Sequence, residues 1–165
     1  MKTKTLSIDL SSAIIFVALL SIASILPLFH NQIITGPLVN AVLFLAVILA
    51  GTQNAILIGL IPSIIAISTG LLPSALSPTV PFIMISNTLL VLSFSYFKDK
   101  NYWLGVVLSS FLKFFFLFAT SSIVINLLVK KELSSKVASM LSLPQLITAL
   151  AGGFLAFIFL KTLKK

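Results

Sequence analysis

The sequence predicts an all-α integral membrane protein with six transmembrane helices, forming a single transmembrane domain over residues 1–165. Hydrophobic residues make up 59% and charged residues only 8% of the chain, whereas soluble domains average roughly 45 to 50% apolar and about 25% charged residues. The apolar residues fall in stretches of about the length that one helix needs to cross a bilayer. Turn residues and lysines separate these stretches, and no linker is long enough to hold a soluble domain.

Six predicted spans follow one another along the chain. They cover residues 12–29, 37–50, 54–72, 81–97, 102–129 and 144–160. A polar stretch from Phe29 to Gly36 reads as a loop, and Pro37 opens the second span because proline suits the first position of a helix. Gly51 starts a tight turn into the third span, which Pro62 is expected to kink.

The last three spans have similar boundary signals. Pro81 and Pro144 open the fourth and sixth spans, where a missing N–H costs nothing. Between spans, residues 72–80 predict a loop or short surface helix, and residues 133–143 predict an amphipathic surface segment. Within the sixth span, Gly152-Gly153 predicts a face that packs closely against another helix.

The start of the chain has an alternative interpretation as a cleaved signal peptide. Ser21-Ile22-Ala23 has the small-x-small form of a cleavage site behind a basic start and an apolar core. However, the apolar run continues through Leu28 and further apolar stretches follow it. We therefore expect a first transmembrane helix.

The lysines predict the orientation, because cytoplasmic loops of membrane proteins carry an excess of basic residues. With both termini in the cytoplasm, the inner side carries Lys2, Lys4, Lys98, Lys100, Lys161, Lys164 and Lys165, and the outer side carries Lys130, Lys131 and Lys136. We expect a multi-pass protein of the plasma membrane with both termini cytoplasmic. Most polar residues of the spans then fall in the outer half.

Lys113 is the charged residue inside a predicted span. A lysine near the bilayer centre costs about 2.5 to 3.5 kcal/mol, so it usually faces protein, water or a ligand rather than lipid. The acids Asp9, Asp99 and Glu132 lie in flanks or loops. The partner of Lys113 must therefore be a carbonyl, an amide oxygen or a group bound from outside.

Polar residues of the outer half predict a binding site for a small polar molecule with a carboxylate, phosphate or carbonyl group. The candidate substrate-binding residues are Lys113, Asn87, Gln145, Thr148, Asn40, Asn126 and His30. Helix starts at Pro81 and Pro144 would add the partial positive charge that carriers use to hold anions. The alternative is structural: amide and hydroxyl side chains often join membrane helices by hydrogen bonds, and a loop histidine can be a plain interfacial residue.

Composition argues against several function classes. The absence of cysteine and the single histidine leave no disulfide, no thiolate metal site and little prospect of a metal cage. Catalysis would depend on Lys113 and hydroxyl groups alone, so we predict no catalytic residues, no cofactor and no enzyme activity. The basic residues lie at the ends of apolar stretches, which predicts a lipid bilayer and no nucleic acid as partner.

Several short blocks resemble a known family. They are Gly36-Pro37-Leu38-Val39-Asn40-Ala41, Val80-Pro81-Phe82-Ile83-Met84 with Asn87, Trp103-Leu104-Gly105, Leu112-Lys113-Phe114, and Leu143-Pro144-Gln145-Leu146-Ile147-Thr148. With the six-helix architecture, they resemble the S components of energy-coupling factor (ECF) transporters, which bind vitamins and other micronutrients for uptake in prokaryotes.

The resemblance implies a substrate-binding subunit that works with a transmembrane coupling subunit and two ATPase subunits. The chain has no Walker A motif, so ATP must be hydrolysed by its partners. One departure concerns the first helix, where better-known S components carry an Ala-x-x-x-Ala pattern and this chain has small residues without that spacing.

Other functions remain as alternatives. A proton-coupled carrier usually places acids or several histidines within its spans, and none of the three acids here lies in one. Another small carrier, a channel or a scaffold without catalytic activity is the remaining alternative to the S component.

Overall fold

The computed structural model describes residues 10–72, 74–128 and 134–163. Within these ranges every regular element is a helix, so the all-α prediction is confirmed. The α-helices are α1 (Leu10–Ile25), α2 (Gln32–Leu49), α3 (Thr52–Ser68), α4 (Val80–Phe97), α5 (Tyr102–Leu128), α6 (Ser134–Met140) and α7 (Leu143–Leu163), and two short 3-10 helices are η1 (Leu26–Phe29) and η2 (Ser74–Thr79).

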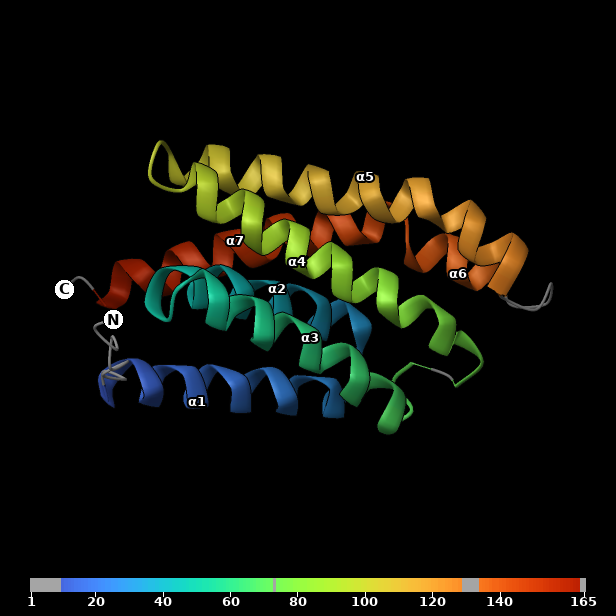
Figure 1. Ribbon diagram of the computed structural model, residues 1–165, viewed down its shortest axis with the longest axis horizontal. Coiled ribbons are helices and arrows are strands. Elements are labelled where there is room, and N and C mark those ends of the chain that lie inside the picture. The colour runs from blue at the N-terminus through green and yellow to red at the C-terminus, as the bar shows by residue number, and fades with distance from the viewer. Residues whose placement is uncertain (1–9, 73, 129–133, 164–165) are drawn as a thin grey trace, which may run out of the picture.

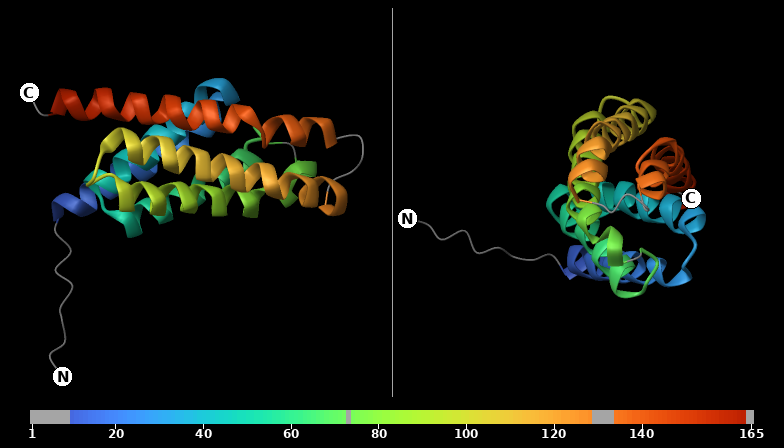
Figure 2. Two further views of the ribbon diagram at one scale, coloured as in Figure 1. Left: turned by 90° about the horizontal axis from the view of Figure 1, so that it is seen from above. Right: turned by 90° about the vertical axis from the view of Figure 1, so that its right-hand side faces the viewer.

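The long helices run back and forth along the long axis of the bundle (Figure 1). The start of α1, the end of α7 and the turns at residues 50–51 and 98–101 share one end, which we call the turn end. Residues 26–31, 69–72, 74–79 and 134–142 form the other end, which we call the cavity end. Helices α1 and α5 lie at opposite edges of the bundle (Figures 1 and 2).

Helix α2 is the centre of the bundle. It contacts α1, α3, α4 and α7, and its contact with α7 is the most extensive. Every residue from 40 to 47 is buried, as expected for a helix that is apolar all round. The second close pair is α4 with α5, and α5 also contacts α7.

Helix α2 begins earlier than the sequence analysis predicted. It starts at Gln32, not at Pro37, so the second half of the predicted loop is helical. Asn31 caps this start, because its side chain accepts a hydrogen bond from the backbone N–H of Ile33 at 3.0 Å. Pro37 lies inside the helix, where it removes one hydrogen bond that neighbouring groups in a membrane bundle can replace.

The other boundaries differ less. The first predicted span is divided into α1 and η1, and α3 ends at Ser68, before the predicted residue 72. The starts of α4, α5 and α7 lie within one residue of their predicted positions, and α6 occupies the predicted surface segment.

Four helical stretches in the described residues are long and apolar enough to cross a membrane. They are Ser11–Phe29, Leu76–Phe97, Tyr102–Ile125 and Val137–Leu163. Ile33–Leu49 and Thr52–Ser68 are shorter apolar helices. The chain therefore has the helices of a multi-pass membrane protein.

The predicted close-packing face on α7 is confirmed. A Cβ atom on Gly152 would lie 2.6 Å from Cβ of Asn40 and 2.8 Å from the carbonyl oxygen of Pro37, so the backbones of α2 and α7 approach each other only because this residue is glycine. A Cβ atom on Gly153 would collide with the side chain of Val106 on α5. These contacts set the position of α7 beside the site described next.

Candidate functional site

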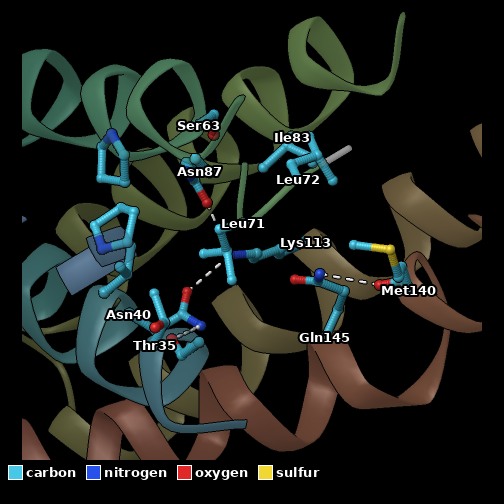
Figure 3. Close-up of a pocket in the computed structure, with 15 residues that line it drawn as sticks. Thr35, Asn40, Ser63, Leu71, Leu72, Ile83, Asn87, Lys113, Met140 and Gln145 are labelled. Carbon is cyan, nitrogen blue, oxygen red and sulfur yellow. Dashed lines mark hydrogen bonds between the residues drawn. The ribbon is translucent and has the colours of Figure 1, made fainter. Parts of the chain in front are cut away.

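Lys113 lies near the middle of α5 and its side chain points into the bundle, where only 3% of it is exposed. Its ammonium nitrogen donates hydrogen bonds to Oδ1 of Asn40 at 2.7 Å and to Oδ1 of Asn87 at 2.8 Å (Figure 3). Of the three kinds of partner expected for this lysine, the structure supplies amide oxygens. They replace water molecules that the ammonium group would have in solution.

Both asparagines are held in this orientation by their own amide groups. Nδ2 of Asn40 donates to the carbonyl oxygen of Gly36 one turn earlier in α2, at 2.9 Å. Nδ2 of Asn87 donates to the carbonyl oxygen of Gly59 on α3, also at 2.9 Å. Because each NH₂ group is bound to a carbonyl, each side-chain oxygen is left to face Lys113. The network joins α2, α3, α4 and α5.

No carboxylate is part of this network in the described residues. Asp99 lies at the turn end, where it is 80% exposed and pairs with Lys98 at 2.6 Å, and Asp9 and Glu132 lie outside the described residues. The charge of Lys113 is therefore stabilised by dipoles and is not neutralised. A site of this kind retains an attraction for a negative or strongly polar group.

A cavity of about 120 Å³ adjoins Lys113 at the cavity end (Figure 3). Its polar lining comes from Thr35, Asn40, Ser63, Asn87, Lys113 and Gln145, and the rest is apolar: Pro27, Gly36, Val39, Pro62, Ala66, Leu71, Leu72, Ile83 and Met140. Small-molecule sites commonly combine an apolar wall with a few polar groups in this way.

Three polar groups at the cavity have hydrogen-bond donors or acceptors that are not used within the described residues. An ammonium group has three N–H donors, and those of Lys113 make two hydrogen bonds within the described part of the chain. Gln145 donates from Nε2 to the carbonyl oxygen of Met140 at 3.0 Å, which leaves its Oε1 free toward the lysine (Figure 3). Ser63 lines the cavity, and no hydrogen bond of its hydroxyl is seen among the described residues.

His30 connects two of the segments that cover the cavity. It has left-handed backbone geometry at φ 53°, and its ring nitrogens lie 2.7 Å from the carbonyl oxygens of Leu28 and Thr69. Pro27 on one side of this bridge and Leu71 on the other both line the cavity. The histidine is exposed and does not reach the cavity itself.

The structure brings together only some of the predicted site residues. Lys113, Asn40, Asn87 and Gln145 share the cavity. Thr148 instead lines an adjoining groove of about 350 Å³ between α2 and α7, where its side chain packs against Gly36. The side chain of Asn126 lies outside the described residues.

Two polar residues of the cavity lining, Thr35 and Ser63, were not among the predicted site residues. Thr35 lies on the part of α2 that was predicted to be loop, where its hydroxyl donates to the carbonyl oxygen of Leu26 at 3.1 Å. Ser63 follows Pro62 inside α3, and a polar residue beside a proline within a helix is the one sequence signal that could have identified it.

Comparisons of the chain with protein-family models, with curated proteins and with solved structures found no match.

Proposed function

We propose that this chain is the substrate-binding subunit of an ECF-type uptake transporter for a small micronutrient. The observation that carries the proposal is the Lys113 site. This buried ammonium group has no acidic partner among the described residues, retains an unused N–H donor, and faces a cavity at one end of the helix bundle. Buried charges in membrane helices generally mark sites for substrates or ions.

The proposal includes six membrane spans with both termini in the cytoplasm. Helix α2 and helix α3 are about 26 Å long at 1.5 Å per residue, slightly less than the roughly 30 Å hydrocarbon core. They run beside α1 from the turn end, and α4 and α5 extend farther at the cavity end (Figure 1). Lys98, Lys100 and Lys161 lie at the turn end, so the positive-inside rule puts the cavity end outside.

Cysteine labelling tests this topology, because the chain has no cysteine of its own. Asp99→Cys should react with an impermeant maleimide only from the cytoplasmic side, and Ser135→Cys only from the outside. Both residues are exposed. Reaction of both from one side, or the reverse pattern, would contradict the topology.

We include coupling and ATPase subunits in the proposal because this sequence shows no means of its own to supply energy for transport. Its sequence contains no Walker A motif, and the cavity has no acid in the described lining that could bind and release protons during transport. Energy for uptake would therefore come from partners: a transmembrane coupling subunit and two ATPase subunits.

A structural role for Lys113 is the competing interpretation, and it has an observation in its favour. The two asparagine bonds link α5 to α2 and α4, as polar side chains do in membrane proteins without any ligand. That interpretation makes no use of the free Gln145 oxygen or of the apolar cavity.

Reconstitution separates a transporter subunit from a scaffold. Co-expressed with an ECF module, the chain should purify together with the coupling and ATPase subunits. Proteoliposomes of that complex should accumulate the compound that mass spectrometry finds in the purified chain, and only with ATP inside the compartment of the ATPases. Multiple-turnover uptake by the chain alone, or failure to associate with any such module, would contradict the assignment.

A further inference from the structure

The size and polar groups of the Lys113 cavity restrict the kind of molecule that it can hold. The inference rests on the proposed function, because it assumes that this cavity is the substrate site. A cavity of about 150 Å³ in another protein binds benzene, and the cavity here measures about 120 Å³. Because the cavity is not closed on all sides, its enclosed part holds at most one ring, and a fused second ring would extend out of it.

The charge of the cavity sets an upper limit on the charge of its ligand. Lys113 is the one ionisable side chain in the described lining, and two amide oxygens already contact it. A single negative charge would be matched by the ammonium group. A second negative charge would have no cation in an otherwise largely apolar enclosure, which is costly.

The arrangement of donors and acceptors defines the polar part of the ligand. Lys113 offers a donor, so the ligand must present an oxygen to it. Gln145 offers the acceptor Oε1 on the same side (Figure 3), so a neighbouring N–H on the ligand would complete the site. Rotating the Gln145 amide to offer a donor instead would break its bond to the Met140 carbonyl oxygen. The apolar body of the ligand would then lie against Val39, Leu72 and Ile83.

We propose that the cavity binds a single-ring carboxamide or monocarboxylate, with its carbonyl or carboxylate oxygen on Lys113 and, in the carboxamide, its N–H on Gln145. Dianionic phosphates are disfavoured by their second negative charge, and two-ring compounds because the second ring would extend beyond the enclosed volume. The proposed substrate class is therefore much narrower than micronutrients in general.

Four commercial probes test this class on the purified full chain in detergent, with binding followed by ligand-observed NMR. Benzamide and benzoate carry the predicted groups on one ring. Phenyl phosphate keeps the ring but carries most of two negative charges at neutral pH, and 2-naphthamide keeps the amide but adds a ring. We expect benzamide and benzoate to bind at least tenfold more tightly than the other two.

Two variants show how the probes are held. Gln145→Leu should weaken the binding of benzamide about threefold to tenfold, which is the effect of one neutral hydrogen bond. The same variant should bind benzoate as tightly as the wild type or more tightly. Thr148→Val is the matched control on the next turn of α7, and it should affect neither probe because Thr148 lines the adjoining groove.

The outcomes distinguish the substrate class from the proposed function. Tighter, Lys113-dependent binding of 2-naphthamide or phenyl phosphate would overturn the class while keeping the site. Equal losses of affinity for benzamide and benzoate in Gln145→Leu would also overturn the proposed substrate class, as would no binding of any probe. Probe binding that survives replacement of Lys113 would remove the site itself, and with it the main support for the proposed function.

Discussion

The two ends of the bundle are held together by different means. Toward the turn end, aromatic rings pack edge to face: the ring centroids of Phe44 and Phe94 are 4.7 Å apart, and those of Phe94 and Tyr102 are 5.6 Å apart. The hydroxyl of Tyr102 donates to the carbonyl oxygen of Gly153 at 2.7 Å. Toward the cavity end, a few hydrogen bonds through Lys113 span the helices and leave a hollow beside them.

The difference separates a closely packed region from a region with a polar cavity, which we propose is the binding region. Helices in lipid associate through close packing and interhelical hydrogen bonds, because lipid is as apolar as their side chains. The turn end uses close packing, and the cavity end gives up part of that packing for polar groups. The two regions meet where Gly152 lies against Asn40, so tight packing of α7 positions one partner of the lysine.

The largest predicted effect comes from filling that contact. Gly152→Ala should destabilise the bundle by about 1 to 3 kcal/mol or more, because the new Cβ meets backbone atoms of α2 that cannot move aside. Gly59→Ala is the matched control: its Cβ would meet only the Leu43 side chain at 3.3 Å and Asn87 Cβ at 3.4 Å. Unfolding measured in detergent should show that Gly152→Ala is less stable than Gly59→Ala. Equal stabilities of the two variants would contradict the proposed role of Gly152.

The second prediction concerns the lysine network. Lys113→Met leaves the buried amide oxygens of Asn40 and Asn87 without a donor, at a cost of about 1 to 3 kcal/mol each, partly offset because a buried charge is removed. We expect a lower thermal midpoint. The triple variant Lys113→Met/Asn40→Leu/Asn87→Leu replaces the whole network with apolar groups of similar size and should recover wild-type stability. A triple variant less stable than Lys113→Met would contradict this account of the network.

The third prediction concerns the cover of the cavity. His30→Asn keeps a residue that tolerates left-handed geometry but loses the contact with the Thr69 carbonyl oxygen. Hydrogen exchange should become faster in residues 69–79, while the aromatic packing at the turn end is unaffected. The loss in global stability should stay near 1 kcal/mol, as for one hydrogen bond. Unchanged exchange in residues 69–79 would show that His30 does not hold the cover.

The smallest predicted effect is a difference in stability between variants of two serines that lie about one turn before Lys113 on α5. The buried hydroxyl of Ser110 has no hydrogen-bond partner in the described part of the chain, whereas Ser109 donates to the carbonyl oxygen of Val106 at 3.1 Å. Ser110→Ala should therefore be slightly stabilising, by up to about 1 kcal/mol, and Ser109→Ala neutral or slightly destabilising. Thermal unfolding that ranks the pair in the opposite order would contradict the hydrogen-bond assignment.

Composition and proline positions were enough to predict the helices but not all their ends. The starts of α4 and α7 were correct within one residue because Pro81 and Pro144 mark them. The start of α2 was missed because Asn31, in a polar stretch that resembles a loop, caps a helix there. A capping side chain identifies a helix start only when the following residues are known to be helical.

The candidate site was partly predictable for a similar reason. The predicted depth in the membrane was enough to select Lys113, and the predicted position in the outer half selected Asn40, Asn87 and Gln145. Which amides contact the lysine depends on how α2, α4 and α5 are rotated about their axes, and that is decided by packing between helices. The rotations of α7 and α3 about their own axes likewise direct Thr148 to the groove and Ser63 to the cavity.

The most direct test of the central claim compares the small molecules that copurify with two proteins of equal stability. The wild type and the Lys113→Met/Asn40→Leu/Asn87→Leu variant should both be folded in detergent, as thermal unfolding would verify. Mass spectrometry should then find one single-ring compound at near-stoichiometric amount in the wild type and none in the variant. The same compound in equal amount in both proteins would show that the Lys113 network is structural and that the binding site lies elsewhere.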